Sequence, residues 1–516
     1  MGEAKRKQLS EQETEAASAG LQTAGGRVQI RWEAKSAATP MGQLAYFIEY
    51  LTLTGLWKGW QEECPLSYNS PNAPTKADVL GTWLLSILSG HKRYSHVTAI
   101  RCDGVNPGLL GMRKVISEDA LRRALIATPE VEGVAWLDRH LEHSVAPLLD
   151  AAWILDIDTT IKPLYGKQEG AVVSYNPHKP GRPAHTYHTY LMAGMRLVLG
   201  AEVQAGDAHA ARHSQPGLLK ILDALPPARR PQMVRGDCGF GGDPFIVPLE
   251  ERGQPYLFKL RLSKNVKRHI ERIFWHEGWR DAGQGWEGKD GSLRLSGWAR
   301  ERRVIVLRRP LKGEMLIAHQ ADDQRVLGFV EVDRKTGQRV TGYETAVLVT
   351  NLEHEILSLG QLYRDRADAE NVFDELKNQW GWGGFTTHDL HRCQLSARAV
   401  ALIYNWWSLF VRLAHPQARR EAITSRPWLM ASVGRRTEHA GQTTITLTGL
   451  HAHFAKAREA LMRTSALLKQ WANTAAEQFN PLAVWLLLCR HITLLLAPPD
   501  PSTPPRLSAF PAHGAA

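Results

Sequence analysis

The segment WILDIDTTI, residues 153–161, decides how the chain folds. Its apolar and β-branched residues alternate with acidic ones, which is typical of a β-strand with one buried face. Short strand-like and helix-like runs follow it, broken by Gly and Pro. In order they are GAVVSY (170–175), LMAGMRLVLGAEV (191–203), SQPGLLKILDAL (214–225), PQMVRGD (231–237), FIVPLEERG (245–253) and PYLFKLRL (255–262). The order β-β-β-α-β-α-β predicts an α/β core.

The segments on either side of this core have a different texture. Residues 41–148 have a helical pattern, with Thr75 and Ser117 as candidate N-caps, and residues 263–355 are rich in Trp, Arg and Gly. The predicted division is a flexible tail (1–40), a helical DNA-binding domain (41–148), the first part of the core (149–262), a β-rich insertion (263–355), the second part of the core (356–412), a helical C-terminal region (413–497) and a second flexible tail (498–516).

The composition limits the classes of protein to which the chain can belong. The 516 residues are 43% apolar and 22% charged, which indicates two to four globular domains and excludes a disordered or coiled-coil protein. Lys and Arg outnumber Asp and Glu by 63 to 52, and the net charge of +11 favours a polyanionic partner such as nucleic acid. The basic excess is pronounced in residues 250–309.

Sequence signals also indicate where the protein works. The five cysteines stand far apart, so the chain has no C-x-x-C zinc pair, and a reducing cytoplasm fits. The N-terminus has no apolar core of the kind a secretory signal needs, and the apolar segment 481–497 is interrupted by Arg490 and His491. We therefore expect a cytoplasmic, nucleoid-associated protein without a membrane partner.

Three acidic residues are candidates for metal-dependent phosphoryl transfer, which needs carboxylates that converge on one point. Asp156 and Asp158 lie two apart on the first strand, so both point to the same face. Asp237 ends a later strand, and Glu370 lies on a helix expected to begin at Tyr363. Asp156 remains a rival to Asp158, and Asp374 a weaker rival to Glu370.

The helix that carries Glu370 presents a polar stripe. Tyr363, Arg366, Glu370 and Lys377 are separated by offsets that place them within a stripe about 60° wide at about 100° per residue. A phenol, a guanidinium and an ammonium would thus surround one acid, which suits a phosphate backbone that approaches a bound metal.

These four residues match the Y-x2-R-x3-E-x6-K signature at every position, and the chain from about 153 to 410 resembles a subgroup of bacterial insertion-sequence DDE transposases. The resemblance implies an RNase H-like core with Asp158, Asp237 and Glu370 as ligands of two Mg²⁺ ions, or of Mn²⁺. It implies that Tyr363, Arg366 and Lys377 contact DNA phosphates. It also implies a hairpin at the transposon end and a homodimer that pairs the two ends.

Several further signals leave alternatives open. Lys179 and Arg182 lie in a basic, Pro- and Gly-rich loop that either follows phosphates or is an exposed turn. In this family a Trp of the insertion can stack on a flipped base; four residues are candidates: Trp275, Trp279, Trp286 and Trp298. The pairs His185/His188 and His388/His391 have ligand-like spacing, but we expect surface histidines, since no Cys or Glu completes a zinc site.

The predicted function is therefore that of a DNA transposase that binds terminal inverted repeats of double-stranded DNA, cleaves a strand and joins the freed 3′-OH to a target. Two alternatives use the same features. An RNase H-like nuclease would cut without joining, and a non-catalytic DNA-binding protein would keep the basic surface but could lose an acid.

Overall fold

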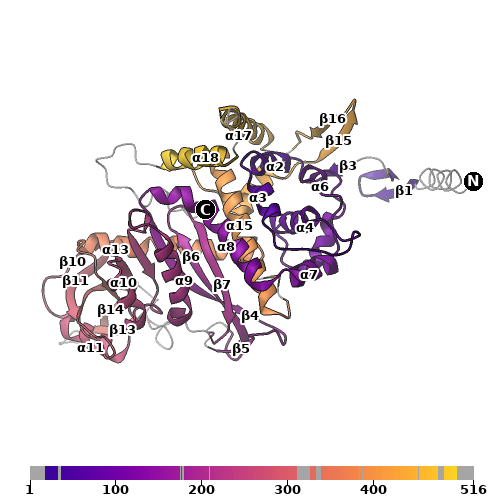
Figure 1. The fold of residues 1–516 in the computed structure, drawn as a ribbon. Helices are drawn as coiled ribbons and strands as arrows, with labels where there is room; N and C mark the ends of the chain where they lie inside the picture. The colour runs from indigo at the N-terminus through magenta and orange to yellow at the C-terminus, as the bar shows by residue number, and fades with distance from the viewer. Residues whose placement is uncertain are drawn as a thin grey trace, which may run out of the picture.

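The computed structural model describes residues 18–496, except 33–36, 175, 177–178, 208–209, 311–325, 333–338, 383, 386, 451–452 and 475–480. A large mixed sheet occupies one side, and helices from both ends of the chain gather on the other (Figure 1). The protein is thus of the mixed α/β class. Of the predicted tails, 1–40 and 498–516, residues 1–17 of the first and all of the second lie outside the described residues.

The sheet has eleven strands. Its main path runs β10 (Arg280–Gly283), β11 (Trp286–Leu293), β12 (Arg302–Pro310), β14 (Arg339–Thr350), β9 (Tyr256–Lys259), β8 (Met233–Gly236), β4 (Ile154–Pro163), β6 (Pro183–Met192) and β5 (Val172–Val173), with β13 (Val326–Val332) on β14 and β7 (Leu197–Ala205) on β6. The strands β4, β8 and β9 are parallel neighbours, whereas β6 and β7 are antiparallel.

The insertion predicted at 263–355 is not a separate β subdomain. Its strand β14 pairs with β9, with Val349 opposite Phe258, so the insertion continues the core sheet. This continuity is possible because Val347, Leu348 and Val349 are all fully buried, as in a strand covered on both faces. The insertion also contains a helix that we did not predict, α11 (Lys264–Phe274).

The first three strands predicted for the core, 153–161, 170–175 and 191–203, need a correction. The run 191–203, expected to be one strand, contains a turn at Gly194 and Arg196, which both have positive φ. The missed strand is β6, whose N-terminal half carries the Pro- and His-rich sequence that reads as a loop. His185 and His188 are therefore buried strand residues, not surface histidines: His185 Nε2 lies 2.7 Å from Glu169 O and His188 Nδ1 2.7 Å from Ser214 Oγ.

The N-terminal helices follow their sequence signals. Thr75 caps α4 by accepting a hydrogen bond from Asp78 N, and Ser117 caps α7 by accepting one from Ala120 N, so both predicted caps are confirmed. The helices of this region are α2 (Leu44–Leu53), α3 (Leu56–Glu62), α4 (Lys76–Leu88), α5 (Val97–Ile100), α6 (Asn106–Leu109), α7 (Glu118–Ala127) and α8 (Glu130–Val145).

The C-terminal region closes the fold around a central helix, α15 (Leu390–Ala414), which packs against β7, α8 and α2 (Figure 1). After it come α16 (Ala422–Leu429), α17 (Phe454–Thr474) and α18 (Pro481–Leu496). None of the helices in the described part of the chain is long and apolar enough to span a membrane.

Short strands near both ends were missed. The hairpin β15 (Gly434–His439) and β16 (Gln442–Leu447) interrupts the predicted helical C-terminal region, and it pairs with β3 (Ala37–Thr39). Residues predicted as a tail also form the exposed hairpin β1 (Ser18–Thr23) and β2 (Gly26–Arg31). A three-residue strand such as β3 is too short to show a periodicity. Its partner β15 is almost 400 residues away in the sequence, so the pairing could not be predicted either.

Candidate active site

The strand β4 directs its acidic residues to one face of the sheet. Leu155 and Ile157 belong to the core under the N-terminal helices, and Ile154 belongs to the core on the opposite face. Since side chains alternate along a strand, Asp156 and Asp158 share the face of Ile154. The two acids have different environments there.

Asp156 forms a buried ion pair and does not line the cavity described below. Arg235 Nε and Nη2 donate to its two carboxylate oxygens at 2.6 and 2.7 Å, and both side chains are almost fully buried. Arg235 Nη1 also donates to Leu362 O, which ties the sheet to the end of α13 (Ile356–Arg364). The ion pair gives Asp156 a structural role, which favours Asp158 over Asp156 as the first catalytic acid.

Asp237 lies beside Asp158 because of the register between two parallel strands. Asp156 is opposite Arg235, so continuing the same register by two residues brings Asp158 level with Asp237. The strand β8 ends at Gly236, and Gly239 N donates to Asp237 Oδ1 at 2.9 Å in the loop that follows. This is the strand-end position at which the sequence placed the second acid.

Glu370 reaches the same region from α14 (Ala367–Gln379). Arg366, the residue before the helix, connects two of the acids: its Nη2 donates to Asp158 Oδ2 at 2.7 Å and its Nη1 to Glu370 Oε1 at 3.3 Å. The Glu370 side chain is 68% exposed, so it has room to change its rotamer.

The single helix predicted from Tyr363 is two helices. The helix α13 ends at Arg364, and α14 begins at Ala367, so Tyr363 and Glu370 lie on different elements. The signature residues nevertheless remain close: Tyr363, Arg366 and Glu370 line one cavity of about 400 Å³ together with Asp158 and Asp237. Lys259 and Trp286 line this cavity, which we call the acid cavity, from the sheet side.

The charges in the acid cavity influence one another. Burial raises the pKa of Asp158 to about 6; Arg366 opposes this shift, and the charges of Asp237 and Glu370 add to it. Burial opposes ionisation of Arg366, but Asp158 and Tyr363 raise its pKa overall. Burial also raises the pKa of Tyr363, so its phenol remains a hydrogen-bond donor at neutral pH. The lining of the cavity thus combines four acids and three basic residues: Asp158, Asp237, Glu344 and Glu370 with Lys259, Arg364 and Arg366.

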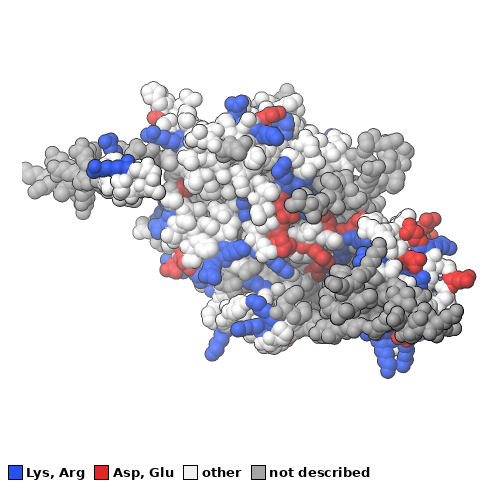
Figure 2. Space-filling model, turned by 180° about the vertical axis from the view of Figure 1, so that it is seen from behind, with Lys and Arg blue, Asp and Glu red and all other residues white. Residues whose placement is uncertain are grey.

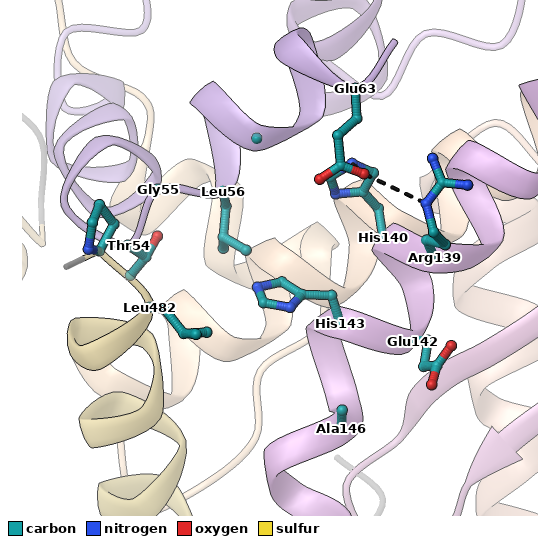
Figure 3. A pocket seen from close by; sticks show the side chains of 12 residues that line it. Thr54, Gly55, Leu56, Glu63, Arg139, His140, Glu142, His143, Ala146 and Leu482 are labelled. Carbon is teal, nitrogen blue, oxygen red and sulfur yellow. Dashed lines mark ion pairs between the residues drawn. The ribbon is translucent and has the colours of Figure 1, made fainter. Parts of the chain in front are cut away.

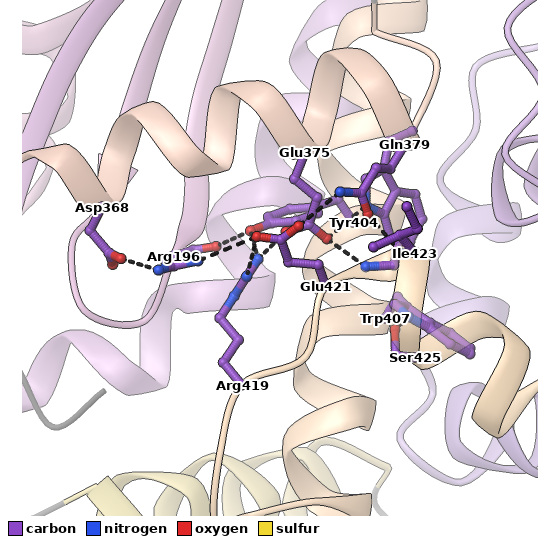
Figure 4. Close-up of polar contacts among 12 residues, drawn as sticks. Arg196, Asp368, Glu375, Gln379, Tyr404, Trp407, Arg419, Glu421, Ile423 and Ser425 are labelled. Atoms are coloured by element: carbon purple, nitrogen blue, oxygen red, sulfur yellow. Dashed lines mark hydrogen bonds and ion pairs between the residues drawn. The ribbon is translucent and has the colours of Figure 1, made fainter. Parts of the chain in front are cut away.

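The C-terminal half of α14 is anchored by contacts with residues that do not line the acid cavity (Figure 4). Glu375 Oε1 accepts hydrogen bonds from Ala422 N at 3.0 Å and from Trp380 Nε1 at 3.2 Å, and Arg419 donates to the other oxygen. Asp374 is exposed and accepts a hydrogen bond from Asn378. Neither residue lines the acid cavity, so Glu370 is the acid that α14 contributes to it.

Two of the residues predicted to contact DNA, Lys179 and Lys377, lie outside the lining of the acid cavity. Lys377 and Lys179 line a second cavity of about 340 Å³, with Lys92 and Lys162, two lysines that the sequence analysis missed. Arg182 lies outside the lining of this cavity, and its guanidinium carbon is 5.1 Å from the Tyr165 ring centroid. Lys162 could have been predicted from the sequence, because it follows Asp158 by four residues and therefore lies on the same face of β4.

The four candidate tryptophans have different environments. Trp286 lines the acid cavity, whereas Trp298 is buried and donates to Gly241 O. Trp279 is covered by Arg308, whose guanidinium carbon lies 3.9 Å from the ring centroid, and Trp275 is 62% exposed. Trp286 is thus the one of the four that lies beside the acids.

Some of the basic residues of the insertion form ion pairs with acids. Arg302 pairs with Glu250 and Asp243, Arg303 with Asp290 and Arg308 with Glu287. On the face shown in Figure 2, Lys and Arg side chains are scattered, and acidic side chains gather near the middle. The positive charge expected on the insertion is therefore partly neutralised within the fold.

The acid cavity provides carboxylates suited to a divalent metal, although within the described residues no group of three His, Cys, Asp or Glu side chains is close enough to form a metal site. Asp158, Asp237 and Glu370 line the same cavity, and the charges of Asp237 and Glu370 raise the pKa of Asp158. Arg366 occupies the space between Asp158 and Glu370. The carboxylate oxygens are of the kind that a hard cation binds, and the exposed Glu370 side chain has room to turn toward one.

A cavity of about 550 Å³ lies elsewhere, between α3, α8 and the start of α18 (Figure 3). Glu63 Oε2 lies 3.4 Å from His140 Nε2 and 3.5 Å from Arg139 Nε. Burial lowers the pKa of His140 to about 4, so the imidazole is neutral at pH 7. This cavity contains none of the three predicted catalytic acids.

A family model matches the part of the chain that lines the acid cavity. Residues 150–406, about half of the chain, match the family model described as the transposase DDE domain, and this match supports a DDE transposase. Among solved structures, the cryo-EM structure of the piggyBac transposase synaptic complex with hairpin DNA is similar at 11% identity, covering 91% of this chain and 90% of that chain with a TM-score of 0.34. No curated protein matches the chain.

Proposed function

We propose that this protein is the transposase of a bacterial insertion sequence, acting in the cytoplasm at the nucleoid. It binds the terminal inverted repeats of double-stranded DNA, cleaves a strand and transfers the 3′-OH, through a hairpin end and as a homodimer. The observation that carries the proposal is the acid cavity, in which Asp158, Asp237 and Glu370 come together with Tyr363 and Arg366.

The order of the central strands supports an RNase H-like core. In the sequence β7-β6-β4-β8-β9, the first acid lies on the central strand β4, the second follows its parallel neighbour β8, and the third comes from a helix beyond the insertion. This placement is the one that the resemblance implies for a DDE transposase.

Asp158, Asp237 and Glu370 would hold two Mg²⁺ ions, or Mn²⁺. Such ions supply activation of a water or hydroxyl nucleophile and stabilise charge on the leaving oxygen. In the first step water attacks the phosphorus, the P–O3′ bond breaks, and a 3′-OH and a 5′-phosphate result. The 3′-OH then attacks the opposite strand, which closes the hairpin and releases a 3′-OH on the flanking DNA, and water reopens the hairpin to give back the 3′-OH and a 5′-phosphate. In the last step the 3′-OH attacks a target phosphodiester, forms a new P–O bond and releases a target 3′-OH.

Arg366 and Tyr363 would bind the phosphate that reacts. Arg366 is held between Asp158 and Glu370, so it is already aimed at the place where a phosphate oxygen would lie. Tyr363, which lines the same cavity, keeps its proton and would donate a hydrogen bond to a phosphate oxygen. These two groups orient the phosphate, which lowers the entropic part of the barrier.

Removal of divalent metal provides the test of this proposal. With purified protein and a labelled duplex that contains the element's end, we expect cleavage in Mg²⁺ and no cleavage after chelation with EDTA, because the carboxylates alone cannot activate water. Binding to the duplex should survive in EDTA when measured by gel shift. Cleavage that continues at full rate in EDTA would contradict the proposal.

A further inference from the structure

Beside the acid cavity lies the second cavity of about 340 Å³, which we call the lysine cavity. Four lysines from separate segments of the chain line it: Lys92, Lys162, Lys179 and Lys377. Its lining contains no Asp or Glu among the described residues. Four ammonium groups around one small cavity repel one another, so this arrangement favours an anionic ligand.

Lys162 is a buried cation without an acidic partner in the described part of the chain. Its side chain is 7% exposed, and its Nζ donates to Tyr187 OH at 2.9 Å and to Gly384 O at 2.7 Å. Burial lowers its pKa to about 8, so most of the group is still charged at pH 7. An ammonium group has three donors, so a third remains for a ligand.

Lys92 is held at the cavity by a close approach between two loops. Phe385 N donates to Lys92 O at 2.7 Å, and a Cβ added at Gly384 would lie only 1.8 Å from the same oxygen. Only glycine therefore fits where this loop passes Lys92. The N-terminal helical region thus contributes directly to the cavity.

A second observation also points to a ligand. Trp382 lines the lysine cavity and is 3% exposed, yet its Nε1 has no hydrogen-bond partner among the described residues. A buried donor without an acceptor is unfavourable, and an anionic ligand brings several acceptor oxygens that would satisfy it. The cavity therefore has both unbalanced positive charge and an unused donor.

The lysine cavity is adjacent to the acid cavity along β4. Asp158 lines the acid cavity, and Thr160, two residues further on the same face, lines the lysine cavity. Two residues of a strand span about 7 Å. A DNA strand that reaches the acid cavity therefore has a backbone phosphate within reach of the lysine cavity.

We propose that the lysine cavity binds a backbone phosphate of the DNA strand that enters the acid cavity, close to the bond that is cleaved. This inference rests on the proposed function and adds Lys92 and Lys162 to its DNA-binding residues. The lysine cavity fixes how far the strand advances past Asp158, so it positions the reacting phosphate.

The test is the salt dependence of DNA binding by the full-length protein. A fluorescein-labelled duplex of about 30 base pairs is titrated by anisotropy over a series of KCl concentrations in EDTA. Lys92→Gln, Lys179→Gln and Lys377→Gln should each weaken binding several-fold and flatten the slope of log K against log salt by about one. Lys58→Gln is the matched control: Lys58 is an exposed lysine on α3 that pairs with Glu62, and its loss should leave the slope unchanged.

Lys162→Met tests the buried member, with thermal unfolding as a check of the fold. If the Lys162→Met protein remains folded, we expect its slope of log K against log salt to flatten in the same way. If it unfolds, the other three variants decide whether the lysine cavity binds a phosphate. Unchanged slopes in all three would overturn the inference. Loss of inorganic phosphate binding by calorimetry with unchanged DNA slopes would also overturn it, in favour of a small phosphate ligand. Cleavage that depends on Mg²⁺ with unchanged slopes would leave the proposed function standing without the lysine cavity.

Discussion

Asp158→Ala, Asp237→Ala and Glu370→Ala should each reduce DNA strand cleavage at least about a hundredfold while DNA binding is retained. Metal stabilisation of the transition state contributes several kcal/mol, and each 1.4 kcal/mol is worth about a factor of ten in rate. Binding depends on basic residues that contact phosphates, so loss of one acid should not weaken it. Cleavage of a labelled duplex in Mg²⁺, beside a gel shift of the same duplex, measures both effects.

The matched control for these variants is Asp374→Ala. Asp374 lies on the same helix as Glu370, but it is exposed and accepts a hydrogen bond only from Asn378. It should cleave as the wild type does. If Glu370→Ala cleaves normally and Asp374→Ala is inactive, the third acid is Asp374 and the assignment of Glu370 is wrong.

Asp156→Ala should reduce the free energy of unfolding by about 3 to 5 kcal/mol, because it leaves the buried Arg235 guanidinium without its carboxylate. Urea unfolding, followed by circular dichroism, measures this loss. The double variant Asp156→Ala/Arg235→Met removes both charges and should recover part of it, since a buried ion pair can be replaced by apolar groups at little cost.

The comparison with Asp158 separates the two neighbouring acids. Asp158 has a raised pKa, so its ionised form is already unfavourable in the fold, and its removal should cost less stability than removal of Asp156. A stable Asp156→Ala protein that does not cleave, beside an active Asp158→Ala protein, would assign the first catalytic acid to Asp156.

Local sequence signals predicted the parts of the site that depend on local geometry. Alternation along residues 153–161 placed Asp158 on a strand face, and the glycines after Asp237 marked the end of a strand. The spacing of Tyr363, Arg366 and Glu370 brought together residues that do line one cavity. The break between α13 and α14 was missed because no Gly or Pro marks it.

Features that depend on distant pairing could not be read from the chain. The strand β6 was missed because Pro183, His185 and His188 are atypical of a buried strand, and only its pairing with β4 and β7 makes it one. The pairing of β14 with β9 likewise depends on residues about 90 positions apart. Lys92 joins the lysine cavity through a tertiary contact that no local periodicity reveals.

Joining of a DNA end to a target tests the central claim most directly, because a nuclease with the same three acids would cut but not join. Purified protein, Mg²⁺, a labelled end with the correct inverted repeat and a supercoiled plasmid are incubated, and the products are resolved on a gel. We expect labelled plasmid joined through the 3′ end, and no such product with Asp158→Ala. Repeated reactions that yield only nicked or fragmented DNA would contradict the transposase assignment and favour a nuclease.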